Sequence, residues 1–201
     1  MNKIITIGRE FGSGGRELGR RLAEELGFEY YDKEIITEIS KHTSLSEEYV
    51  RQVIENTPHN LYPITVGHSM DLANDYTFKQ IQSIYEAQSD TLKAMAEKSD
   101  CVIVGRCGDY ILRDYNPFRL FVHADIESRV ARCISRERAE ENFSVKQMKR
   151  RIKRIDKNRA RYYSFYTGRI WGEKNNYDMC INTTNTEIKE IVPVLAKLFV
   201  D

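Results

Sequence analysis

The sequence has few of the features that mark membrane, secreted or metal-binding proteins. Its 201 residues contain no apolar run near the ~20 residues of a membrane span, and the N-terminus enters a strand-like run without the apolar core of a signal peptide. Its four cysteines form no C-x-x-C pair, and its four histidines do not cluster. Neither a disulfide framework nor a structural zinc site is therefore expected. We expect a cytoplasmic protein whose thiols are free.

The sequence also lacks a large net charge, but its charges are unevenly placed. The formal net charge is +1, yet the segment from Arg129 to Arg169 holds 14 Lys and Arg residues against four Asp and Glu residues. Such a basic block predicts contact with a polyanion, either nucleotide phosphates or nucleic acid. A solvated helix surface is the alternative.

What the sequence does contain, near its N-terminus, is a strand, a glycine-rich loop and a helix in immediate succession. The apolar run Ile4–Gly8 precedes Gly12, Ser13, Gly14 and Gly15, and the apolar residues that follow recur at helical spacing. This arrangement wraps backbone N–H groups around a phosphate, so we expect the loop to bind a nucleoside triphosphate. A flexible turn is the alternative.

The loop departs from the P-loop pattern G-x-x-x-x-G-K-[ST] at its most sensitive positions. If Gly14 is the last glycine of the pattern, Gly15 takes the place of the lysine and Arg16 the place of the Ser or Thr. Arg16 is then a candidate for the missing cation, and Ser13 for the missing hydroxyl near Mg²⁺. Both residues would equally suit the surface of the first helical turn.

The remaining sequence alternates strands with helices, which predicts one α/β domain over residues 1–201 with a parallel sheet covered by helices on both faces. The expected strands are Ile4–Gly8, Phe28–Tyr31, 101–104, Arg119–His123 and Tyr177–Asn182. The expected helices are Gly14–Leu26, 33–42, 44–55, Asp71–Lys98, one after Asp125, 144–163 and Glu187–Val200, with a loop over 56–70. The expected helix caps are Asp32, Ser44, Asp125, Ser144 and Thr184.

Ligands of parallel sheets bind at the carboxyl ends of the strands, and the distinctive polar residues fall there. Arg106 follows a strand and Gly105, so we expect it to bind a substrate phosphate, with a structural salt bridge as the alternative. Asp32 would face the base or sugar of an acceptor, unless it only caps a helix. One crevice should gather the segments Gly8–Arg16, 31–32, 105–106, His123–Asp125 and Asn182–Asn185.

The basic block predicts helices that carry arginines. Arg129, Arg132 and Arg136 recur at spacings of three and four and so share a helical face. Asp156 and Arg159 begin a second such face. Arginines on a mobile lid would stabilise phosphoryl transfer and exclude water. The aromatic end of this block, 159–166, would instead stack nucleic-acid bases or, as the more common outcome, pack in the core.

Several of these motifs resemble those of the cytidylate kinase-like family, relatives of cytidylate kinase among the P-loop nucleoside monophosphate kinases. The resemblance spans nearly the whole chain. It implies a three-layer P-loop NTPase fold, ATP and Mg²⁺ as cofactors, and a nucleoside monophosphate such as CMP or dCMP as acceptor. It also implies a helical substrate-side insertion at about 44–98 and a basic lid at about 132–158. The matching motifs lie at Gly8–Arg16, Tyr31–Glu34, Val102–Arg106, Asn142–Val145 and Asp156–Arg159.

The family's residue roles map onto this sequence by position. Donor phosphates would be bound by Gly12, Ser13, Gly14, Gly15 and Arg16, with Arg16 and Arg132 as the catalytic cations. The acceptor would be bound by Arg106 and Asp32, and its sugar and phosphate by Asp156 and Arg159. The adenine would lie beside Thr183 and Thr184.

Three departures leave alternatives open. The P-loop lysine is missing, Cys107 stands where cytidylate kinases have an aspartate that recognises cytosine, and the insertion lacks the cytidylate-kinase sequence. A kinase of another small metabolite and a nucleotide-binding regulator without turnover therefore remain candidates. Nucleic-acid binding is the weakest reading, and the oligomeric state is left open.

Overall fold

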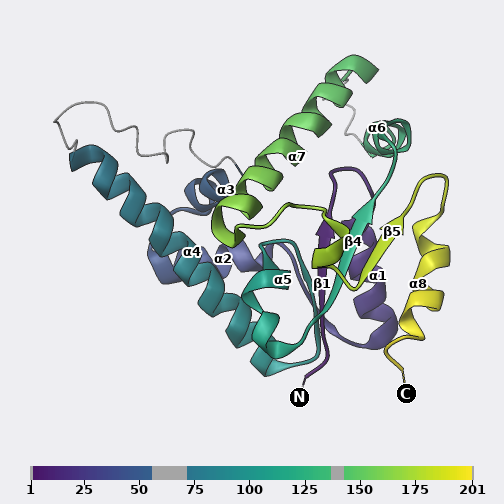
Figure 1. The fold of residues 1–201 in the computed structure, drawn as a ribbon, viewed down its shortest axis with the longest axis horizontal. Helices are drawn as coiled ribbons and strands as arrows, with labels where there is room; N and C mark the ends of the chain where they lie inside the picture. The colour runs from purple at the N-terminus through teal and green to yellow at the C-terminus, as the bar shows by residue number, and fades with distance from the viewer. Residues whose placement is uncertain (1, 56–71, 137–142, 201) are drawn as a thin grey trace.

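A single parallel sheet organises the chain. The computed structural model describes residues 2–55, 72–136 and 143–200. Its five strands lie in the order β2-β3-β1-β4-β5, and every neighbouring pair is parallel. Helices cover both faces (Figure 1), as the alternation of the sequence predicts. The strands are β1 (Ile4–Arg9), β2 (Glu29–Tyr31), β3 (Cys101–Val104), β4 (Phe118–His123) and β5 (Met179–Asn182).

Most helices follow the predicted boundaries, but the short helix Gly108–Ile111 was not predicted, and the last helix ends at Ala196 and not at the predicted Val200. The helices are α1 (Gly15–Leu26), α2 (Glu34–Thr43), α3 (Glu47–Glu55), α4 (Leu72–Lys98), α5 (Gly108–Ile111), α6 (Ile126–Ile134), α7 (Val145–Thr167) and α8 (Ile188–Ala196). Helix α7 continues beyond the predicted end at 163 and ends at Gly168, whose φ of 68° is readily adopted by glycine. The expected loop at 56–70 and positions 137–142 of the expected lid lie outside the described residues.

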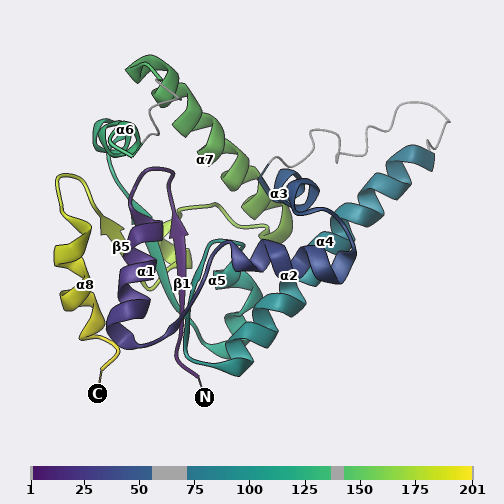
Figure 2. The ribbon, with the colours of Figure 1, turned by 180° about the vertical axis from the view of Figure 1, so that it is seen from behind.

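Two separate apolar cores hold the helices against the sheet. Helices α1 and α8 lie side by side on one face of the sheet (Figure 2). They bury Leu18, Leu22 and Val192 against apolar side chains of β1, β3 and β4. On the other face Ile103 packs with apolar residues of α2, α3, α4 and α7. The inner strands β1, β3 and β4 are largely buried, which explains their nearly continuous apolar sequences, whereas the edge strands β2 and β5 are partly exposed.

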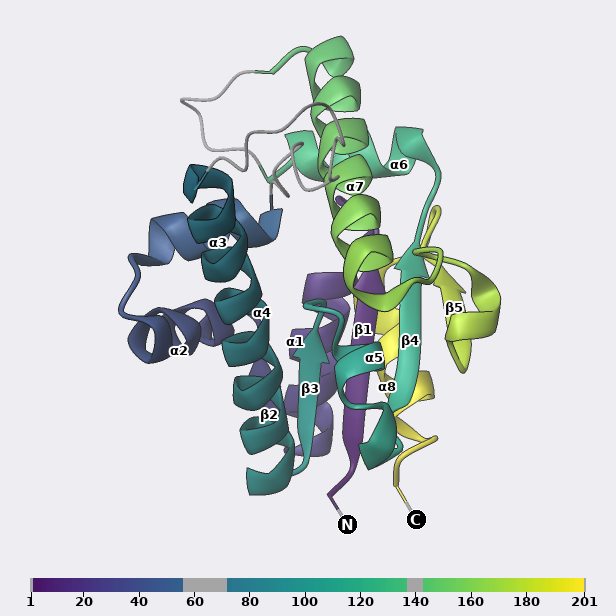
Figure 3. The ribbon, with the colours of Figure 1, turned by 60° about the vertical axis from the view of Figure 1, so that its left-hand side comes forward.

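The carboxyl ends of the strands are covered by a further layer. In Figure 3 the strands run upward, with α2, α3 and α4 to one side and α6 and α7 above the strand ends. Helices α6 and α7 share a small core of Val130, Met148 and Ile152, against which Phe11 of the glycine loop packs. Within the described parts of the chain, no helix is long and apolar enough to cross a membrane.

Two of the predicted caps are confirmed. Asp125 Oδ1 accepts a hydrogen bond from the Ser128 N–H at 2.6 Å, and Ser144 forms a capping box with Gln147. Both interactions join residues three apart in sequence, which is why the local pattern predicts them.

Three predicted caps are wrong. Lys33, not Asp32, precedes α2, and the Asp32 carboxylate binds Arg16 instead. The Thr184 hydroxyl accepts from the Asp125 N–H at 2.9 Å rather than from α8. Ser44 ends α2 with a φ of 54°, and the Ser46 hydroxyl accepts from the first turn of α3. For Asp32 and Thr184, a group on another element binds the side chain that was expected to cap the helix.

Candidate functional site

The glycine loop between β1 and α1 has a backbone that requires glycine. Gly12 has a φ of 79° and Gly14, which precedes α1, a φ of 86°. A Cβ on Gly12 would lie 2.9 Å from the carbonyl oxygen of Arg129. The free N–H groups of the α1 N-terminus point out of such a loop, and they favour an anion.

Arg129 holds the loop from α6. Its Nε donates to the Phe11 carbonyl at 2.8 Å, and its Nη1 lies 3.0 Å from Glu10 Oε2. Its Nη2 pairs with Asp156 of α7, and Asp156 Oδ1 accepts from the Phe11 N–H at 2.8 Å. The Arg129 side chain is only 7% exposed. The two carboxylate oxygens of the predicted site residue Asp156 therefore bind groups of the protein itself, the Phe11 N–H and the Arg129 guanidinium.

A second brace connects the loop with the end of β5. Arg132 donates through Nη1 to the Gly12 carbonyl at 2.9 Å and through Nη2 to the Thr183 carbonyl at 3.0 Å. The buried Thr183 hydroxyl donates to the Ser13 carbonyl at 2.6 Å. The buried Ser13 hydroxyl donates to the Glu10 carbonyl at 2.9 Å. These contacts fix the loop conformation before any ligand arrives.

A cavity of about 430 Å³ opens against the glycine loop, and we call it the loop cavity. This volume lies within the range of small-molecule sites. It is lined by Arg9, Glu10, Phe11, Gly12, Gly14, Gly15, Arg16, Arg132, Cys133, Arg136, Met148, Arg151 and Arg159. The predicted residues Gly12, Gly14, Gly15, Arg16 and Arg132 are therefore gathered around one space.

A second cavity of about 410 Å³, the aromatic cavity, lies between the ends of β1 and β3 and helix α7. Arg106 and Arg159 line it, as do Arg154 and Glu55. Its apolar wall includes Tyr162, Tyr163, Trp171 and Tyr177. Five residues line both cavities, and we call them the shared rim: Arg9, Phe11, Arg16, Arg151 and Arg159.

Burial, and to a smaller extent neighbouring positive charge, lowers the pKa of three arginines around the two cavities, Arg9, Arg106 and Arg159. Burial and then the neighbouring Arg159 lower the pKa of Arg9, and burial lowers that of Arg106. Burial, with Arg106 and Arg16 nearby, lowers the pKa of Arg159 to about 10. The Arg106 Nε is buried without a hydrogen-bond partner. Arginines so close together repel one another, and a bound polyanion would reduce this repulsion.

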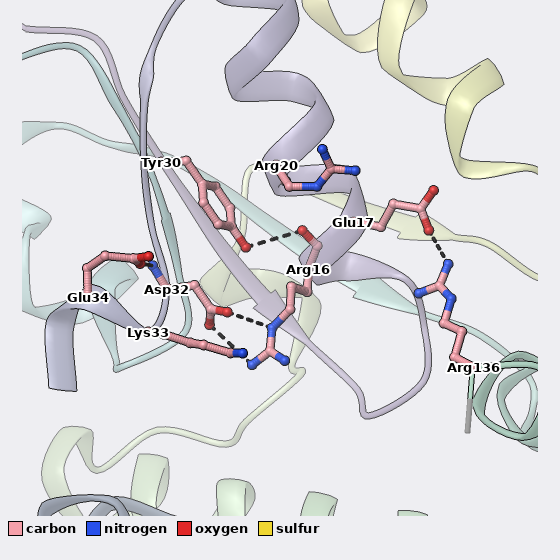
Figure 4. A pocket seen from close by; sticks show the side chains of 8 residues that line it. All are labelled: Arg16, Glu17, Arg20, Tyr30, Asp32, Lys33, Glu34 and Arg136. Carbon is pink, nitrogen blue, oxygen red and sulfur yellow. Dashed lines mark hydrogen bonds and ion pairs between the residues drawn. The ribbon is translucent and has the colours of Figure 1, made fainter. Parts of the chain in front are cut away.

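Asp32 lies in a separate hollow beside α1, lined by Arg16, Glu17, Arg20, Tyr30, Lys33, Glu34 and Arg136 (Figure 4). The Arg16 Nε is 2.6 Å from Asp32 Oδ2, although 58% of the Arg16 side chain is exposed. The Tyr30 hydroxyl donates to the Arg16 carbonyl at 3.3 Å. Asp32 therefore orients Arg16 in this structure.

The aromatic end of the basic block packs in the core, as the more common outcome predicts. Tyr162 and Tyr163 are buried, and Tyr166 stacks on Tyr85 with ring centroids 3.9 Å apart. The Tyr163 hydroxyl donates to Asp109 Oδ2 at 2.6 Å, and burial raises the pKa of Asp109.

Sequence reasoning missed Asp109, Arg9 and the bracing role of Arg129, because their contacts join distant segments.

Comparison with known proteins gives a consistent assignment. Residues 4–185 match the sequence model of the cytidylate kinase-like family. A protein named cytidylate kinase from Methanopyrus kandleri is 23% identical over 97% of this chain and 92% of its own length. An uncharacterised protein from Eubacterium ventriosum has a solved structure that is 27% identical, with a TM-score of 0.68 over 98% of both chains. Shikimate kinase from Bacteroides thetaiotaomicron, at 15% identity and a TM-score of 0.56 over 98% of both chains, has a similar fold.

Proposed function

Because the chain belongs to the cytidylate kinase-like family, we propose that it transfers the γ-phosphoryl group of ATP to a nucleoside monophosphate, with CMP and dCMP as the first acceptors to test. The observation that carries this proposal is the shared rim. Two nucleotide-sized cavities meet at a line of arginines, and phosphoryl transfer needs two bound anions in line with positive charge between them.

In this proposal the donor occupies the loop cavity. Its phosphates lie against the amides of Gly12–Arg16, and the adenine lies toward Thr183 and Thr184. Arg16 contributes a cation from the first turn of α1. Arg132, whose nitrogens bind the carbonyls of Gly12 and Thr183, adds charge while it holds the loop in shape.

The acceptor occupies the aromatic cavity. Its phosphate would pair with Arg106 and Arg159, while Asp32 and Asp156 would act through the cations that they hold. An oxygen of the acceptor phosphate forms a new bond to the γ-phosphorus, and the bond to the β–γ bridging oxygen breaks. ADP leaves with that oxygen. The attacking phosphate oxygen is already anionic, so no general base is required.

Mg²⁺ would enter with the nucleotide. It keeps several waters and binds through substrate phosphates, so it needs few protein ligands. Among the described residues, Glu10 is the acidic residue lining the loop cavity, and no group of three or more His, Cys, Asp or Glu could hold a metal by itself. This donor set fits a metal carried by ATP, which would neutralise charge on the β- and γ-phosphates. The predicted metal ligand Ser13 is buried and is not among the residues that line the loop cavity, so its hydroxyl would reach the metal only if the loop shifted.

A coupled assay of ADP release tests the proposal across CMP, dCMP, UMP and AMP. We expect one of them to stimulate ADP release well above the rate with ATP alone. If none does, the monophosphate-kinase assignment fails. Tight ATP binding by calorimetry, without transfer to any acceptor, would then indicate a regulator.

The aromatic cavity favours one second candidate, a kinase of another small anionic metabolite. Cys107 lines this cavity and stands where cytidylate kinases have the aspartate that recognises cytosine. Arg154 adds a cation to the same cavity. A thermal-shift screen of metabolites with ATP present separates the two candidates, because a true acceptor stabilises the folded protein by mass action.

Asp109→Asn should separate acceptor recognition from stability. Burial raises the pKa of Asp109, so the native state binds its proton more readily than the unfolded state and this residue's contribution to stability falls as pH rises. Asparagine keeps an acceptor for the Tyr163 hydroxyl. We expect a melting temperature at pH 7 equal to or above that of the wild type, with the difference shrinking toward pH 4.

The same variant should change the acceptor KM and leave the ATP KM unchanged, because Asp109 lines the aromatic cavity and not the loop cavity. Melting curves at several pH values and steady-state kinetics check both expectations. A marked loss of stability at pH 7 would contradict this account of Asp109.

A further inference from the structure

Position 15 has no room for the lysine of a P-loop. A Cβ built on Gly15 would lie 2.6 Å from the Cβ of Arg9 and 3.1 Å from its Cγ. Val122 of β4 would lie 3.2 Å from it on another side. Real Cβ atoms essentially never approach so closely, so the Arg9 side chain and a side chain at position 15 exclude each other.

The Arg9 guanidinium reaches from the end of β1 to the shared rim. Its Nη1 lies 1.7 Å from the place that a Cβ on Gly105 would occupy, so glycine at the end of β3 makes room for it. Its Nη2 is 3.9 Å from Asp32 Oδ1, and the side chain is 13% exposed. Arg9 lines both the loop cavity and the aromatic cavity. Its charge is therefore held where the two cavities meet.

We propose that Arg9 is the cation that replaces the missing P-loop lysine. Its aliphatic stem fills the space beside Gly15, and its guanidinium meets the phosphoryl group between donor and acceptor. This inference rests on the proposed phosphoryl transfer. It also explains Gly15, which leaves room for the Arg9 stem, while Gly105 is favoured in any case by its φ of 75°.

Arg16 is less suited to this role. Its Nε is committed to Asp32 at 2.6 Å, and more than half of its side chain is exposed. Arg9 lies farther from the same carboxylate and is more buried. Removal of Arg9 would leave Asp32 paired with Arg16, so variants at position 9 should still fold.

The test uses four variants of the full chain: Arg9→Met, Arg9→Gly, Gly15→Lys and the double variant Arg9→Gly/Gly15→Lys, since only glycine removes the Cβ that a side chain at position 15 would meet. Methionine keeps an aliphatic stem but removes the charge. Arg20→Ala is the matched control, because this arginine is exposed on α1 and pairs only locally with Glu24. Thermal melts establish that each variant is folded.

We expect Arg9→Met and Arg9→Gly to lower kcat about 100-fold, the loss typical of one transition-state cation. Gly15→Lys alone should also be impaired, because the lysine meets Arg9. The double variant should recover at least ~10-fold over Arg9→Gly, as reciprocal exchange of one cation for another predicts. Arg20→Ala should stay near the wild-type rate.

Calorimetry with ATP and ADP gives a second, independent readout. Loss of a cation that meets the γ-phosphate should weaken ATP binding more than ADP binding. A wild type that transfers to no acceptor defeats the proposed function, while this readout still tests Arg9. The Arg9 proposal is overturned if Arg9→Met weakens both nucleotides equally. It is also overturned if an active wild type loses less than ~3-fold in kcat with this change.

Discussion

Replacement of Arg129 by alanine is expected to lower the free energy of unfolding by about 3–5 kcal/mol. The 7%-exposed guanidinium lies between Glu10 and Asp156, so its loss leaves two partly buried carboxylates without their cation. The Phe11 carbonyl would also lose its donor. Equilibrium denaturation by urea measures the effect directly.

A matched pair on the surface provides the control. Arg119 binds Asp178 through two hydrogen bonds of 3.0 and 2.7 Å, but the two side chains are 30% and 34% exposed. Arg119→Ala should therefore cost no more than about 1 kcal/mol. If Arg129→Ala costs as little as Arg119→Ala, the buried triad does not stabilise the loop as described here.

Replacement of Arg106 by alanine is expected to lower kcat/KM for the acceptor about 1,000-fold, the upper range for loss of one preorganised charged contact. Arg106 has a φ of 59°, and the buried Gln88 Nε2 holds its carbonyl at 3.0 Å. Its Nε is buried without a hydrogen-bond partner. Within the described residues this nitrogen has no partner, so it remains available to an anionic ligand of the aromatic cavity.

The melting temperature of Arg106→Ala should not fall together with its activity. Burial lowers the pKa of Arg106, so the charged side chain is unfavourable in the empty cavity, and alanine should leave the melting temperature unchanged or raised. Arg113→Ala serves as the control, because Arg113 is exposed and stacks on Tyr110 outside both cavities. A destabilised Arg106→Ala with normal kinetics would show that Arg106 is structural.

The parts of the fold that depend on neighbouring residues could be predicted from the sequence. The β1–loop–α1 unit appears within one residue of its expected boundaries, because its apolar run and its glycines are local signals. The caps at Asp125 and Ser144 are local as well. Asp32 and Thr184 failed as caps because Arg16 and the Asp125 N–H compete for their oxygens.

The site itself was predictable only in part. The rule that ligands bind at strand ends predicts one crevice, but the structure places the loop glycines and Arg106 in two cavities that share five lining residues. The rule could not identify Arg9, whose importance depends on the space left by Gly15 and Gly105. Nor could it show that Arg129 braces Glu10 and Asp156, since those residues are far apart in sequence.

Transfer of a labelled phosphoryl group tests the central claim most directly. The protein is incubated with Mg²⁺, ATP labelled at the γ-phosphate and each nucleoside monophosphate in turn, and the products are separated. The account predicts label in one nucleoside diphosphate, and far less of it with Arg106→Ala. Label found only in ATP or inorganic phosphate, with every monophosphate tested, would contradict it.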